Sequence, residues 1–173
     1  MCGISGVVGL KNISELLFEG IRNLEYRGYD SCGVALMNKT HLIIKKDIGG
    51  VEEFYRKHNV LKQKSNIGIA HTRWATHGKV TQDNTHPFTS RNGNFAVVHN
   101  GIISNYRPLR DSLKKEGYKF SSETDTEVIA HLLEKFFKRD QNPENFPNLE
   151  GLVSEPSKQP QNELWRENFN DFC

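Results

Sequence analysis

The chain opens with Met1-Cys2-Gly3-Ile4, and a cysteine directly after the initiator methionine is uncommon. Its small side chain permits removal of Met1, which would leave Cys2 with a thiol beside a free α-amine. That amine, with an unperturbed pKa of about 7.7–8.0, suits a general base near neutral pH. It can take the thiol proton directly or through a water, and the thiolate is the attacking form. Cys2 is therefore a candidate nucleophile, although taken alone it is better explained as a small apolar residue at the start of a strand.

The composition is that of an ordinary single domain. The 173 residues are 36% hydrophobic and 25% charged, with a formal net charge of +2, so net charge does not suggest a phosphate-rich partner, and we expect no nucleic acid. No basic segment precedes the first apolar run, and no run is long enough to cross a membrane. The three cysteines, Cys2, Cys32 and Cys173, are odd in number and far apart. A disulfide framework is therefore not expected, and a reducing cytoplasmic setting fits best.

The pattern of apolar residues predicts a mixed α/β chain with its strands in the first hundred residues. Strands are expected at 4–8, 32–37, 41–46, 67–72 and 95–99. Helices are expected from Asn12 to a stop at Gly28, at 51–58, at 105–116 and from about Thr124. Thr124 and Glu127 stand at capping-box spacing, which supports the start of the last helix. A loop rich in Thr, His, Asn and Gly is expected at 75–93.

The character of the sequence changes after Arg139. Four of the six prolines lie between Pro143 and Pro160, among Asn, Gln and Glu. We therefore predict a domain at residues 1–139 and a poorly ordered tail at 140–173, since the tail has little apolar surface to bury. Its aromatic end, with Trp165 and Phe169, could dock back as a short helix or bind a partner.

Four further motifs follow the N-terminal cysteine in a consistent order. They are YRGYDS at 26–31, HTRWATHG at 71–78, VHNGII at 98–103 and SETDTE at 122–127. Together with the Met-Cys-Gly-Ile start, they resemble the class II glutamine amidotransferases, and in particular their aminosugar-forming branch. The resemblance covers about residues 1–138. It implies an α+β fold of the N-terminal-nucleophile (Ntn) hydrolase type, an αββα four-layer sandwich. The later strands of that sandwich have no counterpart in this sequence.

The resemblance also implies roles for single residues. Cys2 would attack the side-chain amide of L-glutamine, giving a thioester and ammonia, while Asn100 and the backbone N–H of Gly101 would stabilise the oxyanion. Arg73 would hold the substrate α-carboxylate, and Asp125 its α-ammonium. Their opposite charges suit a zwitterionic amino acid.

The remaining pocket residues have supporting roles in the same family. Thr76 and His77 would complete the pocket, Trp74 would guard ammonia transfer, and Arg27 would lie near the nucleophile. The other histidines of the region would order the loop around the pocket: His71, His86 and His99. Their spacing matches no regular ligand pattern, so neither a metal nor another cofactor is expected.

Each of these residues also has a plainer interpretation. Arg73 and Asp125 could form a structural ion pair, and Trp74 could be a core aromatic. Asp125 could also be a helix N-terminal charge favoured by the dipole. The motif context favours the functional interpretation.

The aminosugar branch joins its glutaminase to isomerase domains that bind fructose 6-phosphate, and this sequence contains no such segment. The chain could therefore be a truncated product, a subunit that works with an isomerase partner, or a relic. Exposed sheet edges could be covered by a partner or in a homodimer. The leading hypothesis is a glutaminase. The alternatives are a catalytically impaired glutamine- or glutamate-binding regulatory subunit, and an interaction subunit that uses the aromatic tail.

Overall fold

The computed structural model describes residues 2–38, 41–74 and 79–140, with side chains to 137. These residues fall almost wholly within one compact unit, Met1–Lys138. The tail predicted at 140–173 lies outside the described residues apart from Asp140, so its loose order stays a prediction.

A four-stranded antiparallel sheet forms the centre of this unit. Its strands are β1 (Gly3–Val8), β2 (Ser31–Asn38), β3 (His41–Ile48) and β4 (Ile67–Arg73), in the order β1-β4-β2-β3. All four strands were predicted from the sequence, because each carries enough apolar residues to indicate a half-buried or buried strand. β4 lies between β1 and β2, so its residue His71 has Ile4 on one side and Gly33 on the other.

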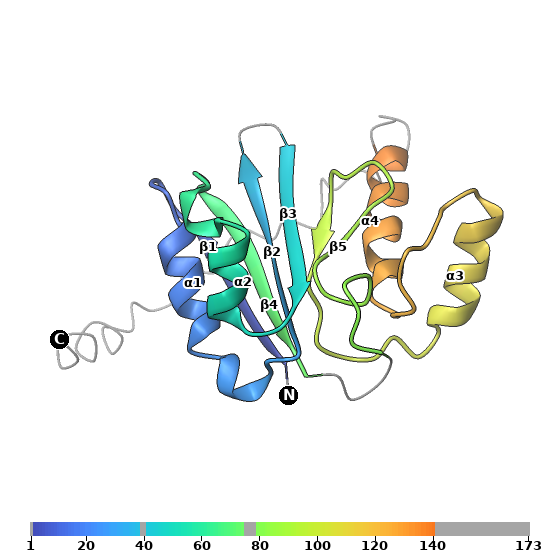
Figure 1. Cartoon of the computed structure of the whole chain (residues 1–173). Helices are drawn as coiled ribbons and strands as arrows, with labels where there is room; N and C mark the ends of the chain where they lie inside the picture. The colour runs from blue at the N-terminus through green and yellow to red at the C-terminus, as the bar shows by residue number, and fades with distance from the viewer. Residues whose placement is uncertain (1, 39–40, 75–78, 141–173) are drawn as a thin grey trace, which may run out of the picture. The chain divides into compact units, whose positions relative to one another are not determined.

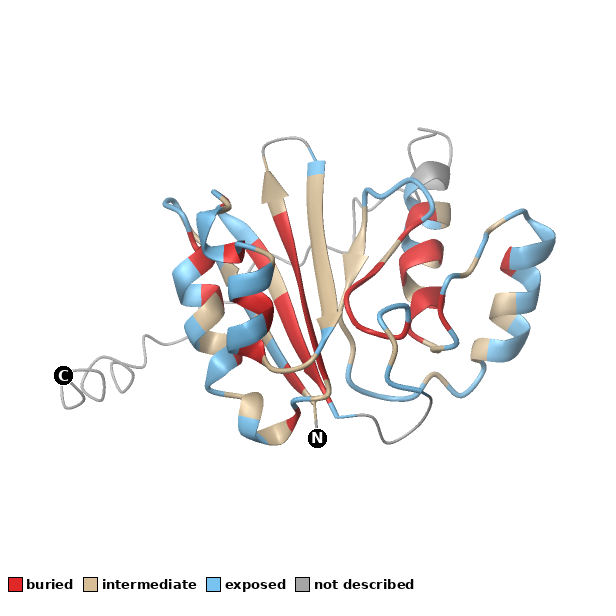
Figure 2. Cartoon of the chain, in the orientation of Figure 1, coloured by how far each residue is buried: buried red, intermediate tan, exposed pale blue. Residues whose placement is uncertain are grey.

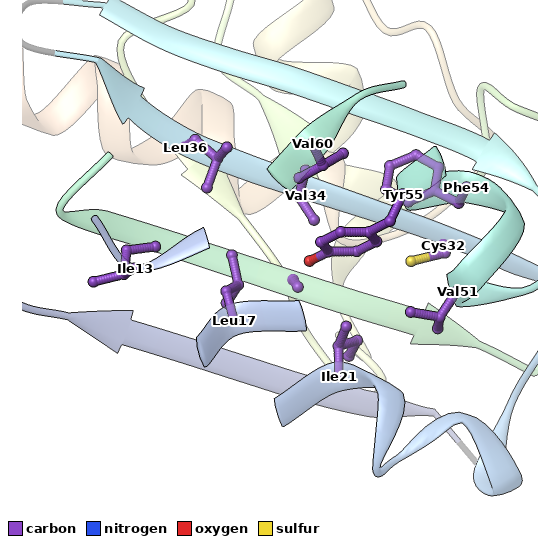
Figure 3. Packing of buried hydrophobic residues seen from close by; sticks show 11 residues of the cluster. Ile13, Leu17, Ile21, Cys32, Val34, Leu36, Val51, Phe54, Tyr55 and Val60 are labelled. Carbon is purple, nitrogen blue, oxygen red and sulfur yellow. The ribbon is translucent and has the colours of Figure 1, made fainter. Parts of the chain in front are cut away.

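Two helices, α1 (Ser14–Arg22) and α2 (Val51–Lys57), cover one face of this sheet (Figure 1). The buried side chains between helices and sheet form the hydrophobic core (Figures 2 and 3), in which each fully buried aliphatic side chain contributes about 1.5–3 kcal/mol. The core cluster comprises Ile13, Leu17, Ile21, Cys32, Val34, Leu36, Val51, Phe54, Tyr55, Val60 and Ala70.

The first helix is shorter than predicted. It ends at Arg22, and a separate 3-10 turn, Glu25–Arg27, follows before Gly28. Glu25 in this turn contacts the second helix: its carboxylate accepts a hydrogen bond of 2.7 Å from the backbone N–H of Val51 at the start of α2. The 3-10 turn thus caps α2. A second 3-10 turn, Val60–Lys62, follows α2.

The opposite face of the sheet is covered by a second, smaller set of elements (Figure 1). These are the two-residue strands β5 (Phe88–Thr89) and β6 (Ala96–Val97), and the helices α3 (Tyr106–Lys115) and α4 (Glu127–Asp140). The order helix, sheet, sheet, helix is that of the αββα sandwich. In the described part of the chain the second sheet has only these two short strands, as expected for a sandwich without its later strands. The strand predicted at 95–99 was too long, and β5 was not predicted.

The capping box predicted at Thr124 and Glu127 is wrong. Helix α4 begins at Glu127, whose buried carboxylate reaches back past Thr124 to Ser121 and Ser122. It accepts their backbone N–H groups and both hydroxyls at 2.7–2.9 Å. Burial acts to raise the pKa of Glu127, but these four hydrogen bonds act against it and the pKa is lowered. The consequence is a rigid turn at 121–126, which carries Asp125.

Gly33 on β2 is a point of close contact between the two layers. A Cβ there would overlap the backbone oxygen of His86 and press on Pro87 and Lys46. The segment after β4 is also held on the sheet by Lys46, whose ammonium donates to the backbone oxygen of Thr85 at 3.0 Å.

We therefore expect Gly33→Ala to lower the free energy of unfolding by about 1–3 kcal/mol, because backbone on both sides would have to move. Urea unfolding measures this loss. Gly6→Ala on β1 is the matched control, since a Cβ there would meet only Ile69, at an ordinary 3.8 Å. Equal stability of the two variants would contradict the tight layer contact.

Candidate active site

An open cavity of about 700 Å³ lies where the end of β4 meets the loops of the second layer. It brings together residues from six separate segments of the chain. The lining residues are Cys2, Arg27, Arg73, Trp74, Asn84, His86, His99, Asn100, Gly101, Ile102, Tyr106, Glu123, Thr124, Asp125 and Thr126. Thus nine of the residues proposed from the motifs line one cavity. Thr76 and His77, also proposed, lie outside the described residues.

Cys2 stands directly before β1 and is partly exposed to the cavity. The pairing of Gly3 with Thr72 brings its side chain to the end of β4. There the backbone N–H of Trp74 donates to the Cys2 Sγ at 3.4 Å, and the Trp74 carbonyl oxygen lies 3.7 Å from the same sulfur. The sulfur is therefore fixed at the cavity by backbone groups.

Asn100 and Gly101 follow β6 and lie beside Cys2. The Asn100 Nδ2 donates to the Cys2 backbone oxygen at 3.2 Å, and the Oδ1 lies 2.9 Å from Nε2 of His71. A Cβ at position 101 would come within 2.7 Å of the His99 ring, so a residue without a side chain fits this position. A side-chain amide and a backbone N–H next to a thiol are the parts of an oxyanion hole.

Arg73 and Asp125 bring opposite charges to the same cavity. Arg73, the last residue of β4, is buried and donates from Nη1 to the Lys79 backbone oxygen at 3.2 Å. The Asp125 Oδ2 accepts the backbone N–H of Ile103 at 2.7 Å, which ties it to the segment after Asn100. Asp125 lies two residues before α4 begins, so its carboxylate is directed by a loop contact.

Trp74 is not a core aromatic: 41% of its surface is exposed. Its ring packs edge-on against Tyr29 at a centroid distance of 5.3 Å, and it lines the cavity together with Arg27. The YRGYDS and HTRWATHG motifs therefore meet at this wall of the cavity.

Three histidines form a buried or half-buried group at the cavity, which His86 and His99 line. The rings of His71 and His86 stack at 4.1 Å, and the hydroxyl of Thr126 lies 3.3 Å from both His86 Nε2 and His99 Nδ1. Burial lowers the pKa of His71 to about 4, with Arg73 and His99 adding to the effect and the Asn100 contact opposing it. Burial and the charges of His71, Arg73, His99 and Lys46 lower the pKa of His86 to about 2. Both rings are therefore neutral at neutral pH.

These shifts predict acid destabilisation. The unfolded chain protonates His86 near its ordinary pKa of 6.5, whereas the folded chain resists protonation until about pH 2. The contribution of His86 to stability is thus complete above pH 6.5 and is lost as the pH falls, by about 1.4 kcal/mol per pH unit. Urea unfolding of wild type and His86→Gln between pH 6.5 and 4.5 measures it: the wild-type free energy should fall more steeply. Identical slopes would contradict a buried, neutral His86.

Several lining residues were not singled out from the sequence. Asn84 donates to the Lys79 oxygen at 3.2 Å and accepts the backbone N–H of Glu123 at 2.9 Å, so it joins the two loops that border the cavity. Thr126 bridges two histidines. The SETDTE motif contained Glu123 and Thr126, but no spacing assigned them a role.

No group of three or more His, Cys, Asp or Glu residues in the described part of the chain is arranged to hold a metal ion. No helix there is long and apolar enough to cross a membrane.

Comparison with known proteins agrees with this geometry. Residues 56–141 match the family model described as a glutamine amidotransferase domain. The chain belongs to the glutamine amidotransferases. A glutamine–fructose-6-phosphate aminotransferase (isomerizing) of Acinetobacter baylyi is 54% identical over 133 residues, which are 77% of this chain and 21% of that protein. The enzyme of the same name from Aquifex aeolicus is 53% identical over 140 residues, 81% of this chain and 24% of that protein.

Solved structures confirm the Ntn amidotransferase fold. The glutamine phosphoribosylpyrophosphate amidotransferase of B. subtilis superposes with a TM-score of 0.66 at 29% identity, covering 78% of this chain and 29% of that one. A second structure, described as the allosteric regulatory enzyme of purine biosynthesis, gives a TM-score of 0.68 at 30% identity, covering 78% and 30%. This amidotransferase chain spans about a fifth to a quarter of the length of the curated relatives it matches.

Proposed function

We propose that the chain hydrolyses L-glutamine to glutamate and ammonia through a thioester on Cys2. The observation that carries this proposal is the convergence of Cys2, Asn100, Arg73 and Asp125 on one cavity. A thiol next to an amide donor supports acyl transfer, and a cation and an anion in the same cavity suit an amino acid substrate.

The reaction can be written with the groups present. With Met1 removed, the Cys2 α-amine takes the thiol proton, and the sulfur attacks the side-chain carbonyl carbon of glutamine. The oxyanion receives hydrogen bonds from the Asn100 Nδ2 and the Gly101 N–H. The intermediate expels ammonia, which takes its proton from the α-ammonium, and leaves a thioester. Water then attacks the thioester, the amine again acting as base, and glutamate leaves with Cys2 restored.

Asp125 provides the sharpest test of the substrate. Asp125→Asn keeps an oxygen that can accept the Ile103 N–H but removes the charge. We expect the KM for glutamine to rise about 10- to 100-fold, with kcat much less affected, because a hydrogen bond to a charged group is lost on binding. Steady-state glutamate release measures both constants.

Two controls test whether Asp125 acts through the α-ammonium of the substrate. Asp111→Asn, on the exposed surface of α3, should keep wild-type constants. A substrate without the α-amine, 4-carbamoylbutanoate, should react equally weakly with wild type and Asp125→Asn. A wild-type KM for glutamine in Asp125→Asn would rule out this binding mode.

We further propose that the ammonia serves amino-sugar synthesis from fructose 6-phosphate. The support is the printed name of the relatives, glutamine–fructose-6-phosphate aminotransferase. The acceptor would be an isomerase domain or subunit, and a homodimer could cover the sheet edges. A reducing cytoplasmic setting suits this chemistry, since the nucleophile must stay a free thiol, as Cys2 and Cys32 are here.

The small second sheet favours one alternative, a regulatory subunit that binds glutamine or glutamate without turnover. Its described strands, β5 and β6, have two residues each. Calorimetry would then show glutamine binding that Arg73→Ala abolishes, while glutamate release stays at the level of Cys2→Ala.

A further inference from the structure

The orientation of the Asn100 side chain is not set by its own strand. Asn100 is exposed and follows a strand of only two residues. The torsion that turns its amide is broad and roughly two-fold, so the oxygen and the nitrogen could exchange places. Only the orientation with the NH₂ group toward Cys2 can stabilise an oxyanion. Some other group must therefore favour that orientation.

The contacts of Asn100 identify this group. The Cys2 backbone oxygen can only accept, so the Asn100 atom 3.2 Å from it must be the nitrogen. The Oδ1 then points to the Nε2 of His71 at 2.9 Å, and since an amide oxygen only accepts, Nε2 must carry the proton. The other ring nitrogen of His71, Nδ1, is buried and has no hydrogen-bond partner among the described residues, which agrees with an unprotonated atom.

His71 is itself held rigidly. It lies within β4 between two paired strands, opposite Ile4 and Gly33. Only 1% of its surface is exposed, and its ring stacks on His86 at 4.1 Å. The ring is thus anchored in the main sheet, and its hydrogen bond extends this rigidity to Asn100 in the second layer.

We propose that His71 is a positioning residue: its Nε2–H holds the Oδ1 of Asn100, so that the amide nitrogen faces the site where the oxyanion forms. This inference rests on the proposed glutaminase function. His71 does not touch the substrate. Its effect is confined to steps in which negative charge develops on the carbonyl oxygen.

The test compares His71→Leu, which removes the donor, with His71→Gln, whose side-chain NH₂ can donate at a similar place. His71→Leu should lower kcat about 10- to 100-fold with little change in KM, as expected for a misplaced catalytic group. His71→Gln should recover most of this loss. His41→Leu, an exposed histidine on β3, is the matched control and should be unaffected.

Two readouts separate positioning from a merely structural role. Alkylation of Cys2 by iodoacetamide forms no oxyanion, so its rate should be the same in His71→Leu and wild type. The double variant His71→Leu, Asn100→Ala should be no slower than Asn100→Ala, because His71 acts through that amide. Parallel losses of alkylation and hydrolysis, or multiplied losses in the double variant, would overturn the proposal.

One measurement is independent of activity. Long-range ¹H–¹⁵N NMR of the histidine rings should show a protonated Nε2 and a bare Nδ1 on His71 at neutral pH. The opposite tautomer would overturn the inference even in an active protein. By contrast, wild-type glutamate release no faster than that of Cys2→Ala would defeat the proposed function, whatever the tautomer.

Discussion

Cys2→Ala is expected to lower the rate of glutamate release from glutamine by about 10⁴- to 10⁶-fold, to a residual rate from binding and the oxyanion hole alone. The physical reason is that the thioester cannot form without the thiol, so water would have to attack the amide directly. Steady-state glutamate release, with ammonia measured in parallel, checks this result.

Cys32→Ala is the matched control for this loss. The Cys32 thiol is 1% exposed within the core, and burial, together with the charge of Glu25, raises its pKa, so it is not a nucleophile at neutral pH. This variant should lose some stability but keep the activity of the folded protein. Full activity in Cys2→Ala, or its loss in folded Cys32→Ala, would contradict a nucleophilic Cys2.

Asn100→Ala is expected to lower kcat for glutamine by about 10²- to 10³-fold, with KM nearly unchanged. The amide donates to the Cys2 backbone oxygen in the free enzyme, so it already lies beside the nucleophile. Its hydrogen bond to the oxyanion exists only once charge has developed, which is why the rate constant rather than binding should change.

Asn94→Ala, in the exposed turn before β6, should leave kcat unchanged. The Cys2 alkylation rate of Asn100→Ala should also match wild type, since alkylation needs no oxyanion donor. An unchanged kcat in Asn100→Ala would remove Asn100 from the reaction.

The main sheet could be predicted from the sequence, whereas the second layer could not. β2 and β4 carry runs of buried residues long enough to show a pattern. β5 and β6 are two residues each, too short for any periodicity. The contact of His86 and Pro87 with Gly33, just before β5, joins segments far apart in the chain, so no local pattern predicts it. The capping-box prediction was wrong for a related reason: the Glu127 carboxylate accepts hydrogen bonds from Ser121 and Ser122 instead of pairing with Thr124.

The same distinction applies to the site: its residues could be predicted from the sequence, but the contacts that orient them could not. Cys2, Arg73, Asn100 and Asp125 stand in recognisable motifs, and all four line one cavity. The contacts that orient them join segments far apart in the chain, as Asn84 does with Glu123. No local spacing encodes such a contact. The tautomer of His71 likewise follows only from which atoms face it.

Mass spectrometry after treatment with an electrophilic glutamine analogue tests the nucleophile and its base together. We expect one adduct, on Cys2 of a chain that has lost Met1, with no label on Cys32 and with protection by excess glutamine. An unlabelled Cys2, or a labelled Cys2 that still follows Met1, would contradict an N-terminal cysteine activated by its own α-amine.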